Sequence, residues 1–597
     1  MSNQTADKNN TFKVPFLPND LPFNNEQKQW LGGFMAGLHS RLLVNEQSQA
    51  VAAAAPVPQK PITIIYGSQT GNAESMAELA AEQASRLGMA PTVLDMDDAD
   101  LQQLAQTERL LVVISTYGEG EMTDNAQNLW DDISTDNAPS FANTYYSVLA
   151  LGDTSYDDFC LAGKLWDERL AQLGGQCIAE RVDCDIDFEG ASEQWMEKAL
   201  PEISQKGSQS NANVISIASN SNKIKSKYTR KNPLAAELTA KEVITGESSS
   251  KEVCHFEFSL GDSGEGYDAG DAINIICLNR ADLVNELLLQ LDLEGDIVIE
   301  EHNKSLHDLF TEELEIRTPS KDFVIALSNK ANNDELSRLV NNNDNEALND
   351  YLWGKDIVDL LNENNDVSFN ATEFIKLCKP LVARAYSISS SIKKHDNEVH
   401  LTIGSVRYSS NGRDHNGVCS TYLADVCQPG DKVHCYFSPN KNFSVPEDQS
   451  LPMIMVGPGT GIAPFRAFLE EREVSNASGD NWLFFGDRNA SSDFIYQDEI
   501  NAWQEKGLLQ RLDLAFSRDQ KEKVYVQDRI RENGEALFEW LEKGAYFYIC
   551  GDAFRMAKDV DAALHEVIEK FGNKTVEEAI AYVNSLKKHK RYVRDVY

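Results

Sequence analysis

The sequence Arg384-Ala385-Tyr386-Ser387 (RAYS) is the stretch on which our interpretation of the fold depends. It separates a helical region from a series of segments with strand-like alternation. Side chains two positions apart in a strand share a face, so Arg384 and Tyr386 should point one way and Ser387 the other. Arginine binds a diphosphate through two parallel contacts, and a serine hydroxyl can hydrogen-bond a ring nitrogen. Because isolated matches of this kind are usually ordinary amphipathic strands, the flanking segments decide its meaning.

The length and composition indicate several globular domains. The chain has 597 residues, 42% of them hydrophobic, which favours three or four domains. No segment reaches the roughly 18 apolar residues of a membrane span, and the polar N-terminus does not resemble a secretory signal. The ten cysteines include no C-x-x-C pair, which argues against a zinc site or a disulfide framework. We therefore expect a cytoplasmic protein without a metal site.

The chain is strongly acidic, with a net charge of −39. Such a chain repels nucleic acids and anionic membranes and favours partners with basic patches. The alternative is that the acidity serves only solubility, and composition does not separate these two interpretations.

Residues 1–60 are predicted to form a tail that contains one helix. Trp30, Phe34, Leu38 and Leu42 recur every four residues and give an apolar stripe. We expect this helix to dock on a second copy or another partner, or else to pack on its own chain.

A phosphate site is predicted after the short strand Ile62–Tyr66. A loop rich in small and hydroxyl-bearing residues follows, and then a helix extends to about Leu87. Backbone N–H groups at a helix start bind anions. The loop has no lysine, so it is not the common nucleotide-binding loop, and it suits a single terminal phosphate. The residues expected here are Ser68, Gln69, Thr70, Gly71, Asn72 and Ala73.

Two further strand ends are expected beside this loop. Leu110–Ser115 leads into Thr116-Tyr117-Gly118, and Tyr146–Leu151 leads into a second loop. Ligands of open parallel sheets bind at the carboxyl ends of the strands. Tyr117 and Tyr156 are placed to enclose a flat ring. The ring-framing residues expected here are Ser115, Thr116, Tyr117, Gly118, Leu151, Gly152, Asp153, Thr154, Ser155, Tyr156, Asp157, Asp158, Phe159 and Cys160.

Residues 205–226 are predicted to be a flexible linker, because they are rich in Ser, Asn, Gly and Lys. The basic residues Lys223 to Lys231 follow it, and they either face solvent or dock an acidic surface.

Strand patterns then enclose a helical insert at about 280–376, which predicts a β-barrel interrupted by helices. Small residues at 417–421 open a helix and form a second anion site, and with Arg384 nearby a diphosphate fits, hence FAD. The residues expected at this site are Arg384, Ala385, Tyr386, Ser387, Thr402, Ile403, Gly404, Tyr408, Gly417, Val418, Cys419 and Ser420.

The last region has the pattern of a doubly wound nucleotide-binding domain. A buried strand, Met453–Val456, leads into Gly457-Pro458-Gly459-Thr460-Gly461 and a helix, and three more strand–loop–helix units follow. A cluster that suits the 2′-phosphate of NADP comes after one strand end, although Asp519 lies within it and a solvated loop is the alternative. The residues expected to bind this nucleotide are Gly459, Thr460, Ser517, Arg518, Lys523, Val524, Tyr525, Val526 and Gln527.

These motifs together resemble those of the NADPH-dependent diflavin reductases. SQTGNAE, STYGEG, RAYS, GPGTGIAPFRAF, CGDAFRMAKDV and the terminal DVY occur in the expected order, from Ile62 to Tyr597. The resemblance implies a multidomain α/β plus β-barrel fold. Its parts are the tail (1–60), a flavodoxin-like FMN domain (61–204), the linker (205–226), an FAD-binding barrel with its insert (227–448) and an NADP-binding domain (449–597). Val418-Cys419 departs from the glycine or alanine that relatives usually have there, and we expect the FAD diphosphate to fit nonetheless.

The resemblance also implies the site and its chemistry. Electrons would pass from NADPH to FAD, then to FMN, and then singly to a haemoprotein. Ser387, Cys550, Asp595 and Tyr597 would lie beside the FAD and nicotinamide rings, with Tyr597 covering the flavin, and Asp559 would contact NADP. A disordered tail is the alternative for Tyr597.

Within the family the chain most resembles the flavoproteins of bacterial sulfite reductases, because its tail differs from a membrane anchor. The implied partner is a haemoprotein with sirohaem and an iron–sulfur cluster that reduces sulfite to sulfide. A general diflavin reductase for another acceptor is the alternative, and a scaffolding role for the N-terminal helix in a homo-oligomer is a third interpretation.

Overall fold

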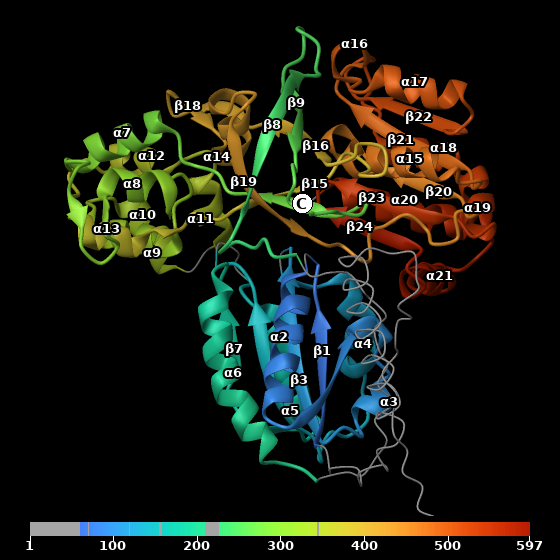
Figure 1. Ribbon diagram of the computed structural model, residues 1–597, viewed down its shortest axis with the longest axis horizontal. Coiled ribbons are helices and arrows are strands. Elements are labelled where there is room, and N and C mark those ends of the chain that lie inside the picture. Colours follow the sequence, from blue (N-terminus) through green and yellow to red (C-terminus); the bar gives the residue numbers. More distant parts are fainter. Residues whose placement is uncertain are drawn as a thin grey trace, which may run out of the picture. The chain divides into compact units, whose positions relative to one another are not determined.

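The computed structural model describes residues 60–597, except for 70, 119, 155–157, 209–225, 343–344 and 554. The predicted N-terminal helix and most of the predicted linker therefore lie outside the described residues. Figure 1 shows the helices and strands with the labels used below.

The first described part is a parallel sheet covered by helices on both faces. The sheet order is β2-β1-β3-β5-β6, with β4 beside β3 and β7 beside β5. Its elements are β1 (Lys60–Gly67), α2 (Asn72–Arg86), β2 (Met89–Asp95), η1 (Met96–Asp98), α3 (Leu101–Leu104), β3 (Arg109–Tyr117), β4 (Glu121–Met122), α4 (Asp124–Ser134), β5 (Tyr145–Leu151), α5 (Leu161–Gln172), β6 (Gln176–Cys177), β7 (Val182–Cys184) and α6 (Phe188–Ser204).

The sequence of the central strands accounts for this arrangement. Leu110–Ile114 of β3 are fully buried, as expected of a parallel strand covered on both faces. Alanines of α2 and Trp195 of α6 pack on one face of the sheet, whereas Trp166 of α5 packs on the other with α3 and α4. Because β1, β3 and β5 are parallel neighbours, their carboxyl ends lie side by side at one edge.

The second part contains a six-stranded antiparallel sheet of order β15-β10-β19-β8-β9-β16. The strands are β8 (Leu234–Val243), β9 (Glu252–Ser259), β10 (Ala272–Ile275), β15 (Arg384–Ser387), β16 (Glu398–Ser405) and β19 (Lys432–Ser438). We predicted a barrel here, but no closed ladder is detected among the described residues. The two outer strands meet at a single bridge, Ile388 to Leu401, beside a hydrogen bond from Ser389 N to His400 O of 2.8 Å. The sheet therefore curls until its edges touch, and closure rests on one bridge instead of a continuous ladder.

Helices inserted between β10 and β15 form a hydrophobic core of their own, which includes Leu287, Phe310, Phe323 and Leu360. These helices are α7 (Ala281–Leu291), α8 (Leu306–Glu312), α9 (Lys321–Lys330), α10 (Asp334–Asn341), α11 (Asn345–Leu352), α12 (Ile357–Glu363) and α13 (Ala371–Leu377). Short pairs of strands accompany the insert and the sheet: β11 (Val298–Ile299) with β12 (Lys304–Ser305), β13 (Leu314–Glu315) with β14 (Lys379–Pro380), and β17 (Arg407–Ser410) with β18 (Arg413–Asn416). The turn after β18 leads into α14 (Val418–Thr421) and the π-helix η2 (Tyr422–Val426).

The third part is a five-stranded parallel sheet of order β22-β21-β20-β23-β24. Helices α15 and α17 pack on one face, and α18 to α21 pack on the other. The elements are β20 (Met453–Val456), η3 (Gly459–Ile462), α15 (Ala463–Ser475), β21 (Asn481–Asp487), α16 (Ala490–Asp493), α17 (Gln497–Glu505), β22 (Arg511–Phe516), α18 (Val526–Glu532), α19 (Gly534–Glu542), β23 (Tyr546–Gly551), α20 (Met556–Phe571), α21 (Val576–Lys588) and β24 (Tyr592–Val596). In the described part of the chain, no helix is both long and apolar enough to span a membrane.

Gly270, just before β10, allows the antiparallel sheet to pack against the nucleotide-binding part. Its φ is +105°, and a β-carbon there would lie 1.8 Å from the carbonyl oxygen of Phe443. Phe443 is fully buried and packs against Phe465, Phe468 and Tyr548. Only glycine is compatible with both the backbone conformation and this close contact.

We predict that Gly270→Ala destabilises the protein by about 3 kcal/mol or more, because the backbone of Phe443 cannot yield without disturbing the aromatic core. Thermal or urea unfolding of the holoprotein measures the effect. Gly261→Ala is the matched control: Gly261 also has positive φ (+54°), but a β-carbon there meets nothing within 4 Å. Equal destabilisation by the two substitutions would show that the contact with Phe443 does not constrain the fold.

Candidate functional site

The loop after β1 forms a cradle that fits a phosphate. Gly71, with φ of +83°, caps the N-terminus of α2. The hydroxyl oxygen of Ser68 is buried and has no hydrogen-bond partner among the described residues. A buried orphan hydroxyl beside a helix start is an unfilled donor, so the residues present fit a phosphate monoester. Thr70, predicted to bind here, lies outside the described residues.

The two predicted ring-framing loops meet at the same edge of the sheet. A β-carbon on Gly120 would lie 2.7 Å from the β-carbon of Asp158, so the loops after β3 and β5 touch. Tyr117 ends β3 and is partly buried, and Gly118 follows it with φ of +53°. Ser155, Tyr156 and Asp157 are outside the described residues, so the predicted second aromatic wall remains a prediction.

Asp185 holds the second of these loops, and the sequence interpretation did not include it. Its carboxylate accepts from Thr154 N at 3.0 Å and from Thr154 Oγ1 at 2.6 Å. Burial opposes ionisation, but the hydrogen bonds from Thr154 lower the pKa of Asp185 below its ordinary value. The residue lies about 30 positions after the loop, and no local pattern links the two.

Three side chains of the RAYS strand, β15, have different partners. The Tyr386 ring packs against the core of the antiparallel sheet. Ser387 Oγ donates to Asp595 Oδ2 at 2.5 Å. Arg384 Nη2 donates to Glu315 Oε2 at 2.8 Å, and Glu315 also accepts from the N–H of Arg317. Glu315 thus orients the guanidinium predicted to bind a diphosphate, a partner that only the tertiary structure identifies.

The turn before α14 contains the unusual Val418-Cys419 pair. Cys419 is 3% exposed and belongs to the core of the antiparallel sheet. Burial raises the pKa of its thiol, and Cys277 and Tyr386 lie near it. The sulfur is therefore directed into the core, which agrees with the expectation that this substitution leaves room for a diphosphate.

Tyr408 offers a flat surface for an adenine ring. One of its faces stacks on His415, with centroids 4.8 Å apart and planes at 13°. Its hydroxyl accepts from Arg317 Nη2 at 3.1 Å, and Arg317 Nε is buried without a partner among the described residues. An orphaned guanidinium nitrogen beside an aromatic ring fits the FAD nucleotide, so Arg317 is a candidate that the sequence motifs missed.

Thr402, Ile403 and Gly404 lie in β16, beside this site. The Thr402 hydroxyl is hydrogen-bonded to Tyr496 OH at 2.6 Å, and Ile403 is 2% exposed in the core. The side chains of Thr402 and Ile403 are thus occupied elsewhere. The predicted contribution of the three residues to binding would therefore come from backbone atoms.

The glycine-rich loop after β20 is shaped by close backbone contacts. A β-carbon on Gly461 would lie 2.2 Å from the carbonyl oxygen of Cys550, and one on Gly457 would lie 2.4 Å from that of Gly461. Gly459 has φ of +59° and Lys251 Nζ nearby, 3.6 Å from the position of a β-carbon. Lys251 also forms an ion pair with Asp487. This lysine comes from the β8–β9 connection and lies beside the nucleotide loop, so it is a further candidate that sequence reasoning missed.

The predicted 2′-phosphate residues surround the end of β22. Arg518 and Lys523 are exposed and make no ion pair with any described residue. Asp519, which seemed to oppose phosphate binding, instead accepts from Asn489 Nδ2 at 3.2 Å and from Ala490 N at 3.0 Å. Gln527 Nε2 donates to Asp559 Oδ2 at 3.1 Å, which brings these two predicted residues together. The free cations and the engaged aspartate fit a phosphate.

Ser387, Cys550 and Asp595 converge where the RAYS strand meets the C-terminal strand. Cys550 and Asp595 are paired neighbours on β23 and β24, and Cys550 Sγ lies 3.8 Å from Asp595 Oδ2. Burial raises the pKa of Asp595, while the hydrogen bonds from Ser387 and Cys550 act against that rise. Tyr597 is 61% exposed, and its hydroxyl lies 3.1 Å from Thr460 Oγ1. Its backbone N–H donates to Gly551 O at 3.0 Å, and its carbonyl oxygen accepts from Ala553 N at 3.2 Å.

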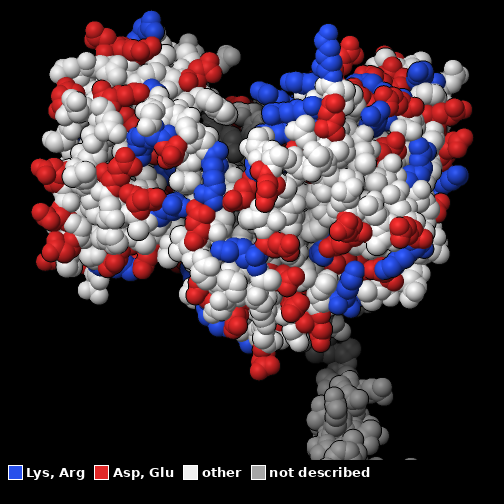
Figure 2. Space-filling view, turned by 90° about the horizontal axis from the view of Figure 1, so that it is seen from above, with Lys and Arg blue, Asp and Glu red and all other residues white. Residues whose placement is uncertain are grey.

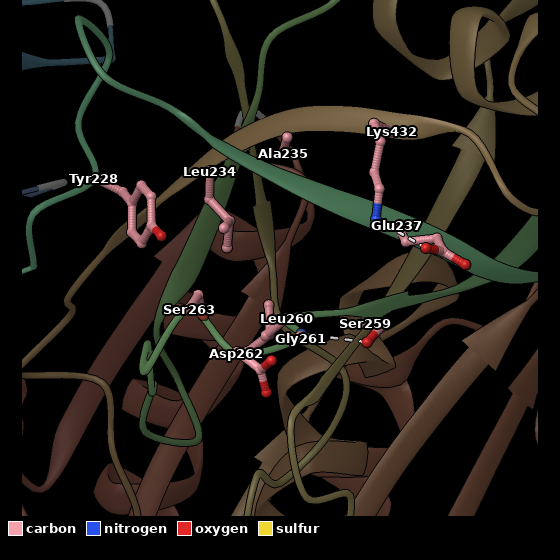
Figure 3. Close-up of a pocket in the computed structure, with 10 residues that line it drawn as sticks. All are labelled: Tyr228, Leu234, Ala235, Glu237, Ser259, Leu260, Gly261, Asp262, Ser263 and Lys432. Carbon is pink, nitrogen blue, oxygen red and sulfur yellow. Dashed lines mark hydrogen bonds and ion pairs between the residues drawn. The ribbon is translucent and has the colours of Figure 1, made fainter.

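The described surface carries charged side chains of both signs and a groove that includes none of the predicted site residues. Figure 2 shows Asp and Glu spread widely over one face, with Lys and Arg more densely grouped near the upper middle of the view. A groove of about 330 Å³ lies between β8, β19 and the turn after β9 (Figure 3). It is lined by Tyr228, Glu237 and Lys432 among others, with Lys432 paired to Glu237 at 2.8 Å, and contains none of the predicted site residues.

Comparison with family models identifies three domains in the predicted order. The chain matches the family described as flavodoxin over residues 64–197, the FAD binding domain over 226–422, and the oxidoreductase NAD-binding domain over 455–562. The cofactors FMN, FAD and NADPH correspond to these three domains.

Known proteins match nearly the whole chain. The sulfite reductase (NADPH) flavoprotein alpha-component of Bacillus subtilis is 41% identical over 96% of this chain and 95% of its own length. Proteins with the same description from Vibrio parahaemolyticus and Shewanella oneidensis are each 40% identical over 96% of this chain, and over 93% and 95% of their own lengths. The chain belongs to the sulfite reductase (NADPH) flavoprotein alpha-component family of NADPH-dependent diflavin oxidoreductases.

Proposed function

We propose that this chain is the flavoprotein component of an NADPH-dependent sulfite reductase and delivers electrons to a haemoprotein that reduces sulfite to sulfide. The observation that carries the proposal is the identity of 40–41% over 96% of the chain to proteins of that description. The three cofactor cradles, present in one chain and in the order FMN, FAD and NADPH, support it.

The chemistry supplied by the bound cofactors is the conversion of a two-electron hydride donor into a source of single electrons. The residues of the chain bind, orient and shield them. We assign Ser387 to hydrogen-bond the FAD ring and Asp595 to stabilise positive charge on the nicotinamide. Cys550, fully buried beside them, would exclude water, and Tyr597 would cover the flavin until the nicotinamide displaces it.

We also retain the domain limits expected from sequence as a proposal: 61–204, 227–448 and 449–597, with residues 205–226 as the linker. The end of α6 at Ser204 and the start of β8 at Leu234 support them. We also propose that the chain is cytoplasmic and forms a homo-oligomer through residues 1–60. The apolar stripe of that segment supports the homo-oligomer.

Deletion of residues 1–50 tests this oligomer by light scattering. We expect a smaller mass with unchanged NADPH–cytochrome c reduction. An unchanged mass would exclude this segment as the contact, and lost reduction would show that it belongs to the catalytic part.

The acceptor is tested by anaerobic NADPH titration of the full chain, with and without a sulfite reductase haemoprotein. We expect reduction of two flavins per chain, and sulfide only when the haemoprotein and sulfite are both present. Flavin absorbance and sulfide release are the readouts. Flavin reduction without sulfide would show that the chain is a diflavin reductase whose acceptor is not the sulfite reductase haemoprotein.

We predict that Asp595→Asn slows flavin reduction by NADPH about 10- to 100-fold, because a neutral amide no longer stabilises the charge that develops on the nicotinamide. FAD content should change little, since the amide can still accept the hydrogen bond from Ser387. Stopped-flow absorbance measures the rate. Asp561→Asn is the control: this carboxylate lies in the same domain but binds Tyr592 OH at 2.7 Å. An unchanged rate in Asp595→Asn would refute the assigned role.

A further inference from the structure

The first turn of α4 lies directly against the phosphate loop of the flavodoxin domain. A β-carbon on Gly67 would be 2.9 Å from both Thr123 Oγ1 and Ala126 Cβ. The loop therefore has no space to shift toward the helix, and the helix start sets where the loop runs.

One side chain of this turn, Asn125, connects three segments of the domain. It is 2% exposed, and its Oδ1 accepts from Ser68 N at 3.0 Å and from Thr123 Oγ1 at 2.8 Å. Its Nδ2 donates to Asp95 Oδ1 at 3.0 Å. The amide thus bridges the end of β2 and the phosphate loop from its own place on α4.

Asp95 determines which end of the Asn125 amide faces the loop. Its Oδ1 also accepts the N–H of Asp97 at 3.0 Å, so this oxygen acts as an acceptor. An acceptor at this position requires Nδ2 opposite it, which leaves Oδ1 of Asn125 for the N–H of Ser68. If the amide were reversed, its Nδ2 would face the N–H of Ser68 and its Oδ1 would face Asp95 Oδ1. A donor would then meet a donor, and an acceptor would meet an acceptor, in a buried site.

The hydrogen bond from Ser68 N to Asn125 determines which donor of Ser68 can bind a phosphate. Because Asn125 holds the Ser68 N–H, that group is not available to an anion, and the residue's remaining donor is its hydroxyl. That hydroxyl is the buried orphan in the cradle. The loop contains no lysine or arginine, so the phosphate is bound by neutral donors, whose strength depends on their direction.

We propose that Asn125 is a positioning residue for the FMN phosphate: it fixes the backbone of Ser68 and thereby aims the Ser68 hydroxyl at the phosphate, with Asp95 fixing the amide. The effect should concern the phosphate and not the flavin ring, because the side-chain hydrogen bonds of Asn125 in the described part of the chain join it to Ser68, Thr123 and Asp95, and only Ser68 is among the predicted cofactor-binding residues.

The test compares FMN with riboflavin, which has the same ring and no phosphate. Full-length protein that retains FAD is stripped of FMN and titrated with each ligand, with flavin fluorescence as the readout. We expect Asn125→Ala to weaken FMN binding about 10-fold or more, while riboflavin binding changes less than about 2-fold. Asn125→Asp should weaken FMN further, since it adds a carboxylate beside Asp95 and near the phosphate.

Asn128→Ala is the matched control. Asn128 lies one turn later on the same helix, and its Nδ2 donates to Asp97 Oδ1 at 3.3 Å without touching the loop. Both ligands should bind this variant as they bind the wild type. Should Asn125→Ala fail to fold, Asp95→Ala, which removes the acceptor of the Asn125 Nδ2 group and so frees that amide to rotate, should produce a smaller loss that is again confined to FMN. Equal weakening of FMN and riboflavin, or unchanged FMN binding, would overturn the proposal.

Discussion

The hydrogen bond from Ser387 to Asp595 joins the RAYS strand to the last strand of the nucleotide-binding sheet, and the redox centre that we propose depends on it. It forms only because β24 pairs in register with β23, which sets Asp595 beside Cys550. That edge in turn requires Gly461 to approach the carbonyl of Cys550 more closely than any side chain would allow. The proposed hydride path is therefore a property of backbone packing as much as of the three side chains that line it.

The three proposed phosphate sites would meet one electrostatic problem in different ways. The chain carries a net charge of −39, so each anionic cofactor meets a repulsive field. The FMN cradle uses oriented neutral donors next to a helix start. The proposed FAD site would use Arg384, which forms an ion pair with Glu315 at 2.8 Å. The proposed 2′-phosphate site instead keeps Arg518 and Lys523 exposed, which suits a nucleotide that must bind and leave during each cycle.

The antiparallel sheet carries the proposed FAD residues although its outer strands share only one bridge in the described part of the chain. Its outer strands meet at one bridge, yet Ser389, Ser390 and Ser391 beside that bridge are all fully buried. Ser391 binds Glu470 and Glu471 of α15, so the closing edge is anchored by the neighbouring part and not only by its own strand partner. The nucleotide-binding part therefore helps to complete the sheet that carries the FAD residues.

Sequence alone determined the order of the three cofactor domains and the helical insert, and it predicted the segments that we propose for the site. These are local properties: strand–loop–helix order, glycine where backbone must approach backbone, and the absence or presence of cations in a loop. The sequence predicted a barrel but not that a single bridge joins its outer strands, because whether the last pair of strands forms a ladder depends on the curl of the whole sheet. Asp185, Glu315, Arg317, Lys251 and Asn125 were also missed. Each lies tens to hundreds of positions from the group it orients, so only tertiary folding brings the donor and acceptor within hydrogen-bonding distance, and no period or spacing along the chain records that contact.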